Sequence, residues 1–188
     1  LTDPDGGAAS CRVYNEWIAD ALGGRPRFAC AGLVPTWRVE DARREVAALA
    51  GAKPQHVVFT SGATEAANLL LTPDWTMGRG PLKVSRLYVA ASDHACLLSG
   101  GRFAAAQVQR LPVDGDGLLD PRTVAQALAG HDRQAGLAMI AIHAANNETG
   151  VIQPFAEIGA LTRAAGAMLV LDAVQAAGRI PLDISASN

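Results

Sequence analysis

The stretch that decides the fold is residues 144–183, AANNETGVIQPFAEIGALTRAAGAMLVLDAVQAAGRIPLD. The apolar run Gly136–Ala145 ends abruptly in Asn146–Gly150, which indicates a buried strand that passes into a polar loop. Apolar residues then keep helical spacing from Phe155 to Thr162, so we predict a crossover helix that returns the chain for another parallel strand. In open α/β sheets, ligands bind where such strands end.

The returning strand, Ala167–Leu171, leads into a carboxylate and an amide. It delivers Asp172 at its carboxyl end, and Gln175 follows three residues later. A carboxylate that emerges from an apolar strand needs a partner. That partner can be a ligand, the magnesium ion of a P-loop enzyme, or the main chain of a helix start that the carboxylate caps. The chain has no GxxxxGK(S/T) motif, which disfavours magnesium.

Segments of strand and helix character alternate along the rest of the chain, without repeats or a linker. The further strands expected are His56–Thr60, Arg86–Ala91 and Gln107–Val113. The further helices expected are Ser10–Leu22, Thr36–Ala50, Ala63–Leu71, Ala95–Ala106 and Pro121–Ala129. In Thr36–Ala50, apolar residues including Val46 and Leu49 are expected inside and charged ones, including Arg43, in solvent. The alternation predicts an α/β fold with a mostly parallel sheet covered on both faces.

A second junction between a strand and a helix has the sequence TSGATE, residues 60–65. Its small residues would let a ligand approach main-chain N–H groups at the positive end of a helix dipole, where a phosphate fits. The same pattern also suits an ordinary capped helix start, so alone it does not separate the two. Neither GxxxxGK(S/T) nor GxGxxG occurs in such a setting, which excludes a P-loop and a dinucleotide-binding fingerprint.

Composition narrows the class of protein. The 188 residues suffice for one sizeable domain, and the net charge of −2 disfavours nucleic acid or an anionic membrane as a partner. No apolar stretch approaches the roughly 20 residues of a membrane span, and the acidic, Gly-rich start is not a signal peptide. Cys11, Cys30 and Cys96 fit neither a disulfide framework nor a CxxC motif. We therefore expect a soluble protein of the cytoplasm, with structural or incidental thiols.

The four histidines do not form a metal site in this interpretation. His56 and His143 are expected within strands and His131 in a loop, which leaves His94 at the carboxyl end of a strand. No HExxH motif or Cys/His cluster has the spacing of metal ligands.

Four motifs occur in one order along the chain: Thr60–Asn68 (TSGATEAAN), Asp93-His94, Asn146–Gln153 (NNETGVIQ) and Leu171–Gly178 (LDAVQAAG). In sequence and in mutual spacing they resemble the cysteine desulfurases of the class V aminotransferase group, which are pyridoxal-phosphate enzymes of fold type I. The resemblance covers about residues 36–185. It implies a three-layer αβα sandwich with a mostly parallel mixed sheet, in which residues 36–188 are part of the cofactor-binding large domain. Residues 1–35 match the family poorly.

The resemblance implies contacts with pyridoxal 5′-phosphate (PLP) from Ala63, Thr64, His94, Asn147, Asp172 and Gln175. Ala63 and Thr64 would bind the phosphate, which agrees with the argument from the helix start. His94 would stack on the pyridine ring and shuttle protons.

The other three residues would contact the edge of the ring. Asn147 and Gln175 would hydrogen-bond its phenolic oxygen, and Asp172 would pair with the pyridine nitrogen. A carboxylate that faces this nitrogen keeps it protonated, so the ring can withdraw electrons from a substrate carbanion.

The activity implied is the removal of sulfur from L-cysteine, which leaves L-alanine and an enzyme persulfide for iron–sulfur cluster or thio-cofactor assembly. The partners implied are a second copy of the chain in a homodimer and a sulfur-acceptor or iron–sulfur scaffold protein. One alternative is another class V lyase or aminotransferase that uses the same cofactor. The other is a non-catalytic relic that binds PLP weakly or only pairs with another chain.

Two catalytic residues of the family have no match in this sequence. The family's Schiff-base lysine follows the aspartate by about one strand and a turn, in a Ser-x-His-Lys motif, whereas this sequence ends at Asn188, 16 residues after Asp172 (188 − 172). The family's persulfide cysteine belongs to a later loop, and Cys11, Cys30 and Cys96 match no such position. We therefore expect either a piece of a longer protein or a truncated relic.

The 188 residues alone are therefore predicted to form no specific imine with PLP and to lack desulfurase activity. An imine-forming lysine must be desolvated or lie near other cations, and neither Lys53 nor Lys83 has such a setting in the sequence. The measurement is borohydride reduction after incubation with PLP, followed by mass-spectrometric mapping of the modified lysines. Stoichiometric labelling of a single lysine, together with alanine formation from cysteine, would contradict the prediction.

Overall fold

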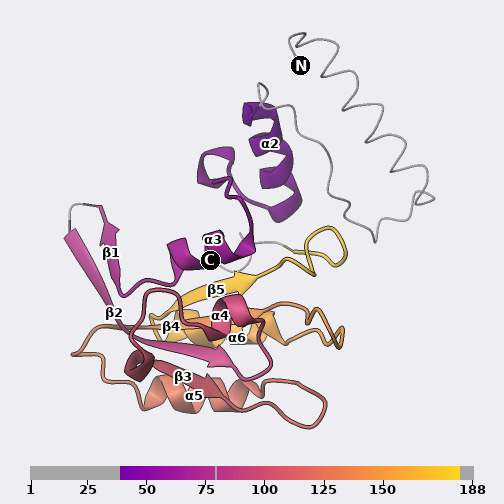
Figure 1. Ribbon diagram of the computed structural model, residues 1–188. Coiled ribbons are helices and arrows are strands. Elements are labelled where there is room, and N and C mark those ends of the chain that lie inside the picture. The colour runs from indigo at the N-terminus through magenta and orange to yellow at the C-terminus, as the bar shows by residue number, and fades with distance from the viewer. Residues whose placement is uncertain (1–38, 79, 183–188) are drawn as a thin grey trace, which may run out of the picture. The chain divides into compact units, whose positions relative to one another are not determined.

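The computed structural model describes residues 39–78 and 80–182, which form two compact units (Figure 1). In the described part, one unit comprises residues 39–59 and 176–182 and the other residues 60–175. The first contains α2 (Val39–Ala50) and the short 3-10 helix η1 (Pro54–His56). The second contains α3 (Ala63–Leu70), β1 (Asp74–Met77), β2 (Gly80–Ala90), α4 (Ala95–Leu98), η2 (Ala105–Gln107), β3 (Val108–Leu111), α5 (Pro121–Ala129), β4 (Leu137–His143), α6 (Phe155–Ala164) and β5 (Met168–Asp172).

Four strands of the larger unit form a parallel sheet in the order β3-β2-β4-β5. Leu87 lies opposite both Val108 of β3 and Met139 of β4, and β4 continues the register with His143 opposite Asp172. β1 is antiparallel to the first residues of β2. The predicted mostly parallel mixed sheet is therefore confirmed.

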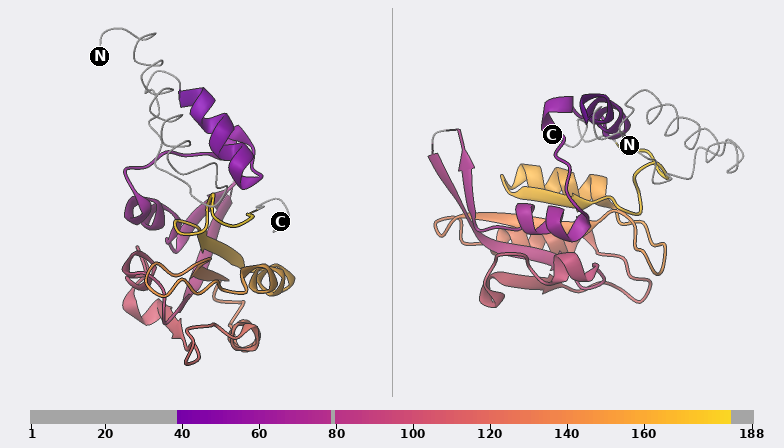
Figure 2. Two further views of the ribbon diagram at one scale, coloured as in Figure 1. Left: turned by 90° about the vertical axis from the view of Figure 1, so that its right-hand side faces the viewer. Right: turned by 45° about the horizontal axis from the view of Figure 1, so that its top comes forward.

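Side chains alternate between the two faces of this sheet. Leu87 and Val89 of β2 pack on one face, in a core that also includes residues of α3 and α4. Tyr88 and Ala90 pack on the other face, in a core shared with α5 and α6. Figure 2 shows the helices on either side of the strands. The αβα layering expected of the larger unit is thus confirmed, and both faces of a parallel sheet are buried as such sheets require.

Local signals explain where α5 begins and where α6 ends. The carboxylate of Asp120 accepts a hydrogen bond from the main-chain N–H of Arg122, and Pro121 occupies the first helical position, as predicted. α6 ends before Gly166, whose φ of 64° suits glycine after a helix. The crossover helix and the strand that follows it are therefore confirmed.

The predicted strand His56–Thr60 is wrong. His56 ends η1, and residues 57–60 form no strand within the described part of the chain. Arg43 of α2 donates a hydrogen bond to the carbonyl of Val57 and lies over the ring of Phe59 at 5.5 Å, so its side chain is not simply solvated. Val58 remains 73% exposed. The prediction failed because a β-branched sequence forms a strand only where a partner strand is available.

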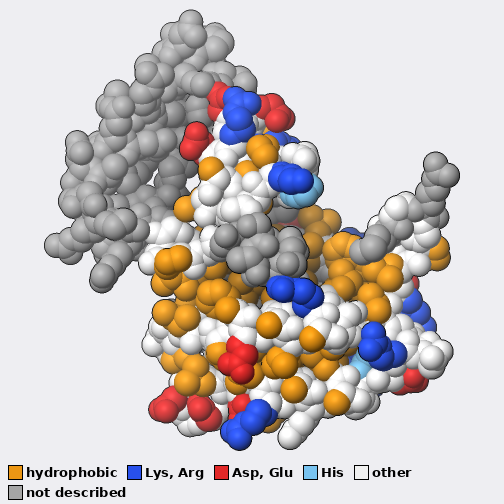
Figure 3. All heavy atoms as spheres, turned by 180° about the vertical axis from the view of Figure 1, so that it is seen from behind, with side chains coloured by type: hydrophobic (Ala, Val, Ile, Leu, Met, Phe, Trp, Pro, Cys, Tyr) orange, Lys and Arg blue, Asp and Glu red, His pale blue; other side chains and the backbone are white. Residues whose placement is uncertain are grey.

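The helix α2 agrees with the described part of the predicted helix Thr36–Ala50, but its predicted burial is confirmed only in part, since Ala42 is buried. Val46 and Leu49, which were expected inside, are exposed. Apolar side chains are also exposed on the larger unit, and Figure 3 shows many of them between charged groups on one face. The predicted helix Ser10–Leu22 and the thiols of Cys11 and Cys30 lie outside the described residues.

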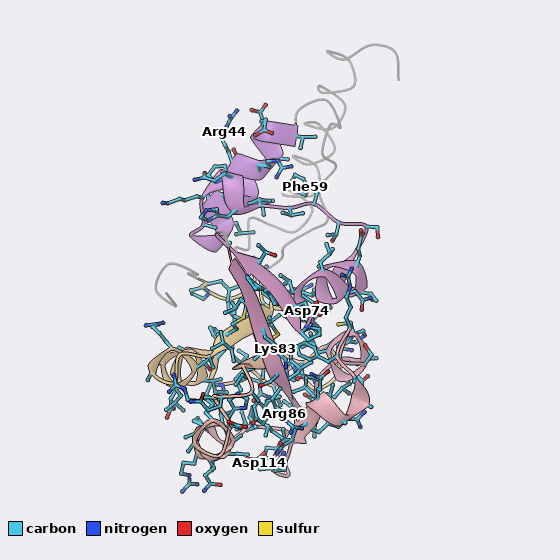
Figure 4. The ribbon with its side chains drawn as sticks, turned by 90° about the vertical axis from the view of Figure 1, so that its left-hand side faces the viewer. Arg44, Phe59, Asp74, Lys83, Arg86 and Asp114 are labelled. Carbon is cyan, nitrogen blue, oxygen red and sulfur yellow. The ribbon has the colours of Figure 1, made fainter. Side chains whose placement is uncertain are left out.

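The antiparallel pair formed by β1 and the start of β2 was not predicted. Lys83, expected in a loop, lies in β2 directly opposite Asp74 (Figure 4). None of the helices in the described part is long and apolar enough to cross a membrane.

The predicted helix Ala95–Ala106 is also wrong in length, because α4 ends at Leu98. Gly100 and Gly101 follow with φ of 75° and 56°, a left-handed conformation that interrupts a helix. A Cβ atom at Gly101 would lie 2.5 Å from the carbonyl oxygen of Leu71, so the chain passes here against the end of α3.

Gly101→Ala is expected to destabilise the protein by more than about 1 kcal/mol, because alanine is strained at positive φ and its Cβ meets the main chain of Leu71. Gly115→Ala is the matched control, since a Cβ at Gly115 meets nothing within 4 Å. Urea unfolding measures both free energies. Equal stability of the two variants would contradict the role of Gly101.

Candidate functional site

Three of the predicted site residues lie near the ends of strands at one edge of the parallel sheet. His94 follows β2 by four residues, Asn147 follows β4 by four residues, and Asp172 is the last residue of β5. Because neighbouring strands are parallel, their carboxyl ends meet at the same edge, which is where ligands bind in such sheets. The main-chain N–H of Ala144 donates to the carbonyl of Asp172 at 2.8 Å and continues the pairing past the end of β4.

Cys96 joins His94 to Asp172. Its thiol lies 3.8 Å from Oδ2 of Asp172, and its main-chain N–H donates to Nδ1 of His94 at 3.2 Å. Burial, followed by the negative charge of Asp172 and the hydrogen bond to it, raises the pKa of the Cys96 thiol. The thiol therefore stays protonated and donates to the carboxylate, which gives Cys96 a part in the site that its sequence context did not reveal.

Asp172 also forms a local turn. Its Oδ1 accepts a hydrogen bond from the main-chain N–H of Val174 at 2.9 Å, so one carboxylate oxygen acts as the structural cap that the sequence left open. The other oxygen, Oδ2, faces Cys96. The carboxylate is thus held in one orientation while the residue stays only partly buried.

The start of α3 is held by local contacts. The main-chain N–H and hydroxyl of Ser61 donate to Oε2 of Glu65 at 2.6 and 2.7 Å, which lowers the pKa of Glu65, mainly through the hydroxyl. The first helical hydrogen bond runs from Ala66 N to Gly62 O. Within the described part of the chain, the N–H groups of Ala63 and Thr64 donate no hydrogen bond, as expected for the first turn of a helix. Both residues are exposed and can receive an anion.

The loop after β4 is held by Asn146, not Asn147. Oδ1 of Asn146 accepts from the N–H groups of Glu148 and Thr149, and its Nδ2 donates to the carbonyl of Ser92 at 2.9 Å. Asn147 is exposed beside it. The loop that carries Asn147 is therefore fastened to the loop that precedes His94.

The remaining predicted residues are placed less closely together. Gln175 is partly buried, three residues after Asp172. Among the residues that the structure describes, no hydrogen bond joins Ala63, Thr64 or Asn147 to Asp172.

A buried group of polar side chains at the same edge was missed as a unit. His143 hydrogen-bonds both Asp93 and Gln153, and the latter two residues lie in motifs noted in the sequence. The sequence did contain a signal for this group, because Asp93 precedes His94 and Gln153 ends the NNETGVIQ segment. The contact between Asp93 and His143, however, spans 50 residues of sequence, which no local pattern displays.

Comparison with protein-family models identifies the chain. The model described as aminotransferase class-V matches residues 32–188, which is most of the sequence. The chain belongs to the aminotransferase class-V family.

Relatives within this class-V family include a cysteine desulfurase IscS of Anaeromyxobacter sp. (strain Fw109-5). It is 38% identical over 161 residues, which are 81% of this chain and 38% of the relative. The chain thus spans less than two fifths of the length of such curated relatives.

Solved structures agree with this placement in the class-V family. A NifS-like protein from Rickettsia africae ESF-5 matches with a TM-score of 0.65 and 26% identity, over 85% of this chain and 43% of that one. A structure described as SspA in complex with cysteine matches with a TM-score of 0.64 and 25% identity, over 87% of this chain and 48% of that one. The fold is that of the large domain of PLP-dependent enzymes of fold type I.

Asp172→Asn is expected to speed the alkylation of Cys96 and to shift its pH profile to lower pH. The negative charge of Asp172 and the hydrogen bond to it contribute to the raised pKa of this thiol, so removing the charge lowers the pKa and increases the thiolate fraction at a given pH. Iodoacetamide labelling between pH 7 and 10, mapped at residue 96, is the measurement. Asp116→Asn removes the same charge at an exposed position and should leave the profile unchanged. An unchanged profile in both variants would show that Cys96 and Asp172 do not interact.

Proposed function

We propose that this chain is part of a PLP-dependent cysteine desulfurase. The observation that carries the proposal is the arrangement at the carboxyl edge of the sheet, where Asp172 is joined through Cys96 to His94. The relatives named as cysteine desulfurases support the same assignment. PLP, when bound, supplies a pyridinium ring that stabilises a carbanion at the substrate.

The donors present in the structure fit this cofactor. A phosphate suits the exposed first turn of α3, where the N–H groups of Ala63 and Thr64 point out of the helix with the positive end of its dipole. The carboxylate of Glu65 accepts hydrogen bonds from Ser61 and, in the described part of the chain, none from the N–H groups of Ala63 or Thr64, so those two donors stay available. The helix packs on the sheet through Ala67 and the following Leu71, so the two parts belong to one folded unit.

Asp172 would pair with the pyridine nitrogen and keep a proton there. Its Oδ1 is fixed by Val174 N–H and its Oδ2 is fixed by the Cys96 thiol, so the carboxylate needs no reorientation after the ring binds. Pre-organised charge of this kind is more effective than a mobile carboxylate. Asn147 and Gln175 would contact the phenolic oxygen from the neighbouring loops.

His94 would stack on the ring and move a proton. Its Nδ1 accepts a hydrogen bond from Cys96 N–H, so the neutral imidazole carries its proton on Nε2. The ring is exposed, which leaves Nε2 accessible to a substrate. In this proposal the two nitrogens have different tasks: Nδ1 would orient the ring, and Nε2 would hold the transferable proton.

The substrate proposed is L-cysteine, with L-alanine as the product and a persulfide as the form in which sulfur leaves. One structurally similar protein is described in complex with cysteine, which supports this substrate class. We further propose a homodimer that works in the cytoplasm and passes sulfur to an acceptor or an iron–sulfur scaffold protein. The imine-forming lysine and the persulfide cysteine are assigned to parts of the complete protein outside these 188 residues.

Asp172→Asn in the complete protein is expected to abolish alanine formation from L-cysteine while PLP remains bound. The phosphate contacts at α3 do not involve residue 172, whereas the ring nitrogen loses the charge that keeps it protonated. Visible absorbance measures the bound cofactor, and product analysis measures alanine.

Asp116→Asn, an exposed change of equal charge, should retain full activity. Near-normal turnover of Asp172→Asn would show that the residue is misassigned. If the unaltered protein converted other amino acids but not L-cysteine, another class V reaction would replace the proposed one.

A further inference from the structure

Three polar side chains are buried at the edge of the sheet that carries the proposed site, yet none of them has a task in the proposed reaction. Asp93 is 5% exposed, His143 is 3% exposed and Gln153 is 2% exposed. They come from different segments: the loop after β2, the last residue of β4, and the end of the loop that follows β4. Buried ionisable groups of this kind are costly unless every polar atom is paired.

The hydrogen bonds of the carboxylate account for both of its oxygens. Oδ2 of Asp93 accepts from Ala90 N–H at 2.7 Å. Oδ1 accepts from the main-chain N–H of His143 at 2.9 Å and from Nδ1 of the same residue. Asp93 thus closes its own loop onto β2 and fastens that loop to the end of β4.

The amide of Gln153 completes the set. Its Oε1 accepts from Leu119 N–H at 2.9 Å, and its Nε2 donates to the carbonyl of Gly117 at 2.8 Å and to Nε2 of His143 at 3.3 Å. His143 therefore donates from Nδ1 and accepts at Nε2, which is the neutral imidazole with its proton on Nδ1. All side-chain polar atoms of the three residues have partners.

The three residues adjoin the proposed cofactor contacts. Asp93 immediately precedes His94. His143 lies opposite Asp172 in the β4–β5 register. Gln153 N–H donates to the carbonyl of Ala144 at 2.9 Å and closes the loop that carries Asn147.

A further bond crosses between the loops, since Asn146 donates to the carbonyl of Ser92. The loops before His94 and around Asn147 are therefore tied both to each other and to the buried histidine.

We propose that Asp93, His143 and Gln153 form a positioning network that holds His94, Asn147 and Asp172 in place before the pyridine ring binds. This inference rests on the proposed function, because it concerns the same site. A gain in stability alone does not explain the network, since replacing a buried, hydrogen-bonded set of side chains by apolar groups of the same shape can be nearly neutral. Fully satisfied buried polar networks instead fix one arrangement of the segments that they join.

The test uses this chain with pyridoxine 5′-phosphate, which has the ring and the phosphate of PLP but no aldehyde to react with lysines. His143→Leu removes both ring contacts. His143→Asn keeps a donor near the position of Nδ1 for Asp93 and loses only the contact with Gln153. His131→Leu is the matched control, because His131 is partly buried and bonds the carbonyl of Gly136 ahead of β4, away from the carboxyl ends of the strands.

The melting temperature of each variant is measured first. The affinity for pyridoxine 5′-phosphate is then measured by fluorescence at a temperature at which all variants are folded. We expect His143→Leu to bind about tenfold more weakly, as is typical when a supporting contact behind a ligand-binding group is lost. His143→Asn should recover part of this loss, and His131→Leu should bind like the unaltered chain. Hydrogen exchange without ligand should become faster at residues 91–95 and 145–152 in His143→Leu, but not in α5.

Two results would overturn the inference while leaving the proposed function intact. One is unchanged affinity and exchange in a folded His143→Leu. The other is failure of both His143 variants to fold, which would reduce the network to a role in stability. If the unaltered chain bound no pyridoxine 5′-phosphate, the inference would be overturned before any substitution is made, and the proposed function would be decided separately, by alanine formation in the complete protein.

Discussion

The parallel pairing of β2, β4 and β5 is the constraint on which the rest of the larger unit depends. Parallel strands end at a common edge, and there their main-chain groups lose their sheet partners and must be paired by side chains or turns. Asp93 pairs Ala90 N–H at the end of β2, and Asp172 pairs Val174 N–H at the end of β5. The same requirement that completes the strands therefore concentrates carboxylates, amides and imidazoles at the edge where ligands bind in open α/β sheets.

The two carboxylates at this edge have different environments, and the environments separate their roles. Asp93 is fully enclosed and both of its oxygens are committed to Ala90 and His143, so it can only hold segments together. Asp172 is partly buried, and its second oxygen is approached by a thiol, a weak donor that a stronger one can displace or join. A pyridinium nitrogen is such a donor. The enclosed carboxylate thus suits a structural task and the accessible one a chemical task.

Much of the fold could be predicted from local patterns, because β4, α6 and β5 are defined by apolar periodicity and by Gly166, and α5 by Asp120 and Pro121. The errors fall where the local structure depends on contacts with residues that are distant in the sequence. Residues 57–60 have strand composition but no neighbouring strand in the described chain, and the position of Gly101 is set by its approach to Leu71. The site shows the same division. The strand-end positions of His94 and Asp172 could be read from the sequence, whereas Cys96 reaches Asp172 across 76 residues and His143 reaches Asp93 across 50.

The two parts of the candidate site, the first turn of α3 and the sheet edge that carries Asp172, are held in different ways. The first turn of α3 is fixed by contacts within five residues, between Ser61 and Glu65, and its N–H groups are exposed. The edge with Asp172 is fixed by bonds that join three loops and two strands, several of them buried. In the proposed function, the phosphate would therefore bind to a helix start that needs no distant support, while the ring would have to fit an arrangement that depends on the whole edge. Phosphate contacts supply affinity that any phosphorylated ligand shares, so in the proposed function the discrimination in favour of a pyridine ring would have to come from the edge that the buried network holds.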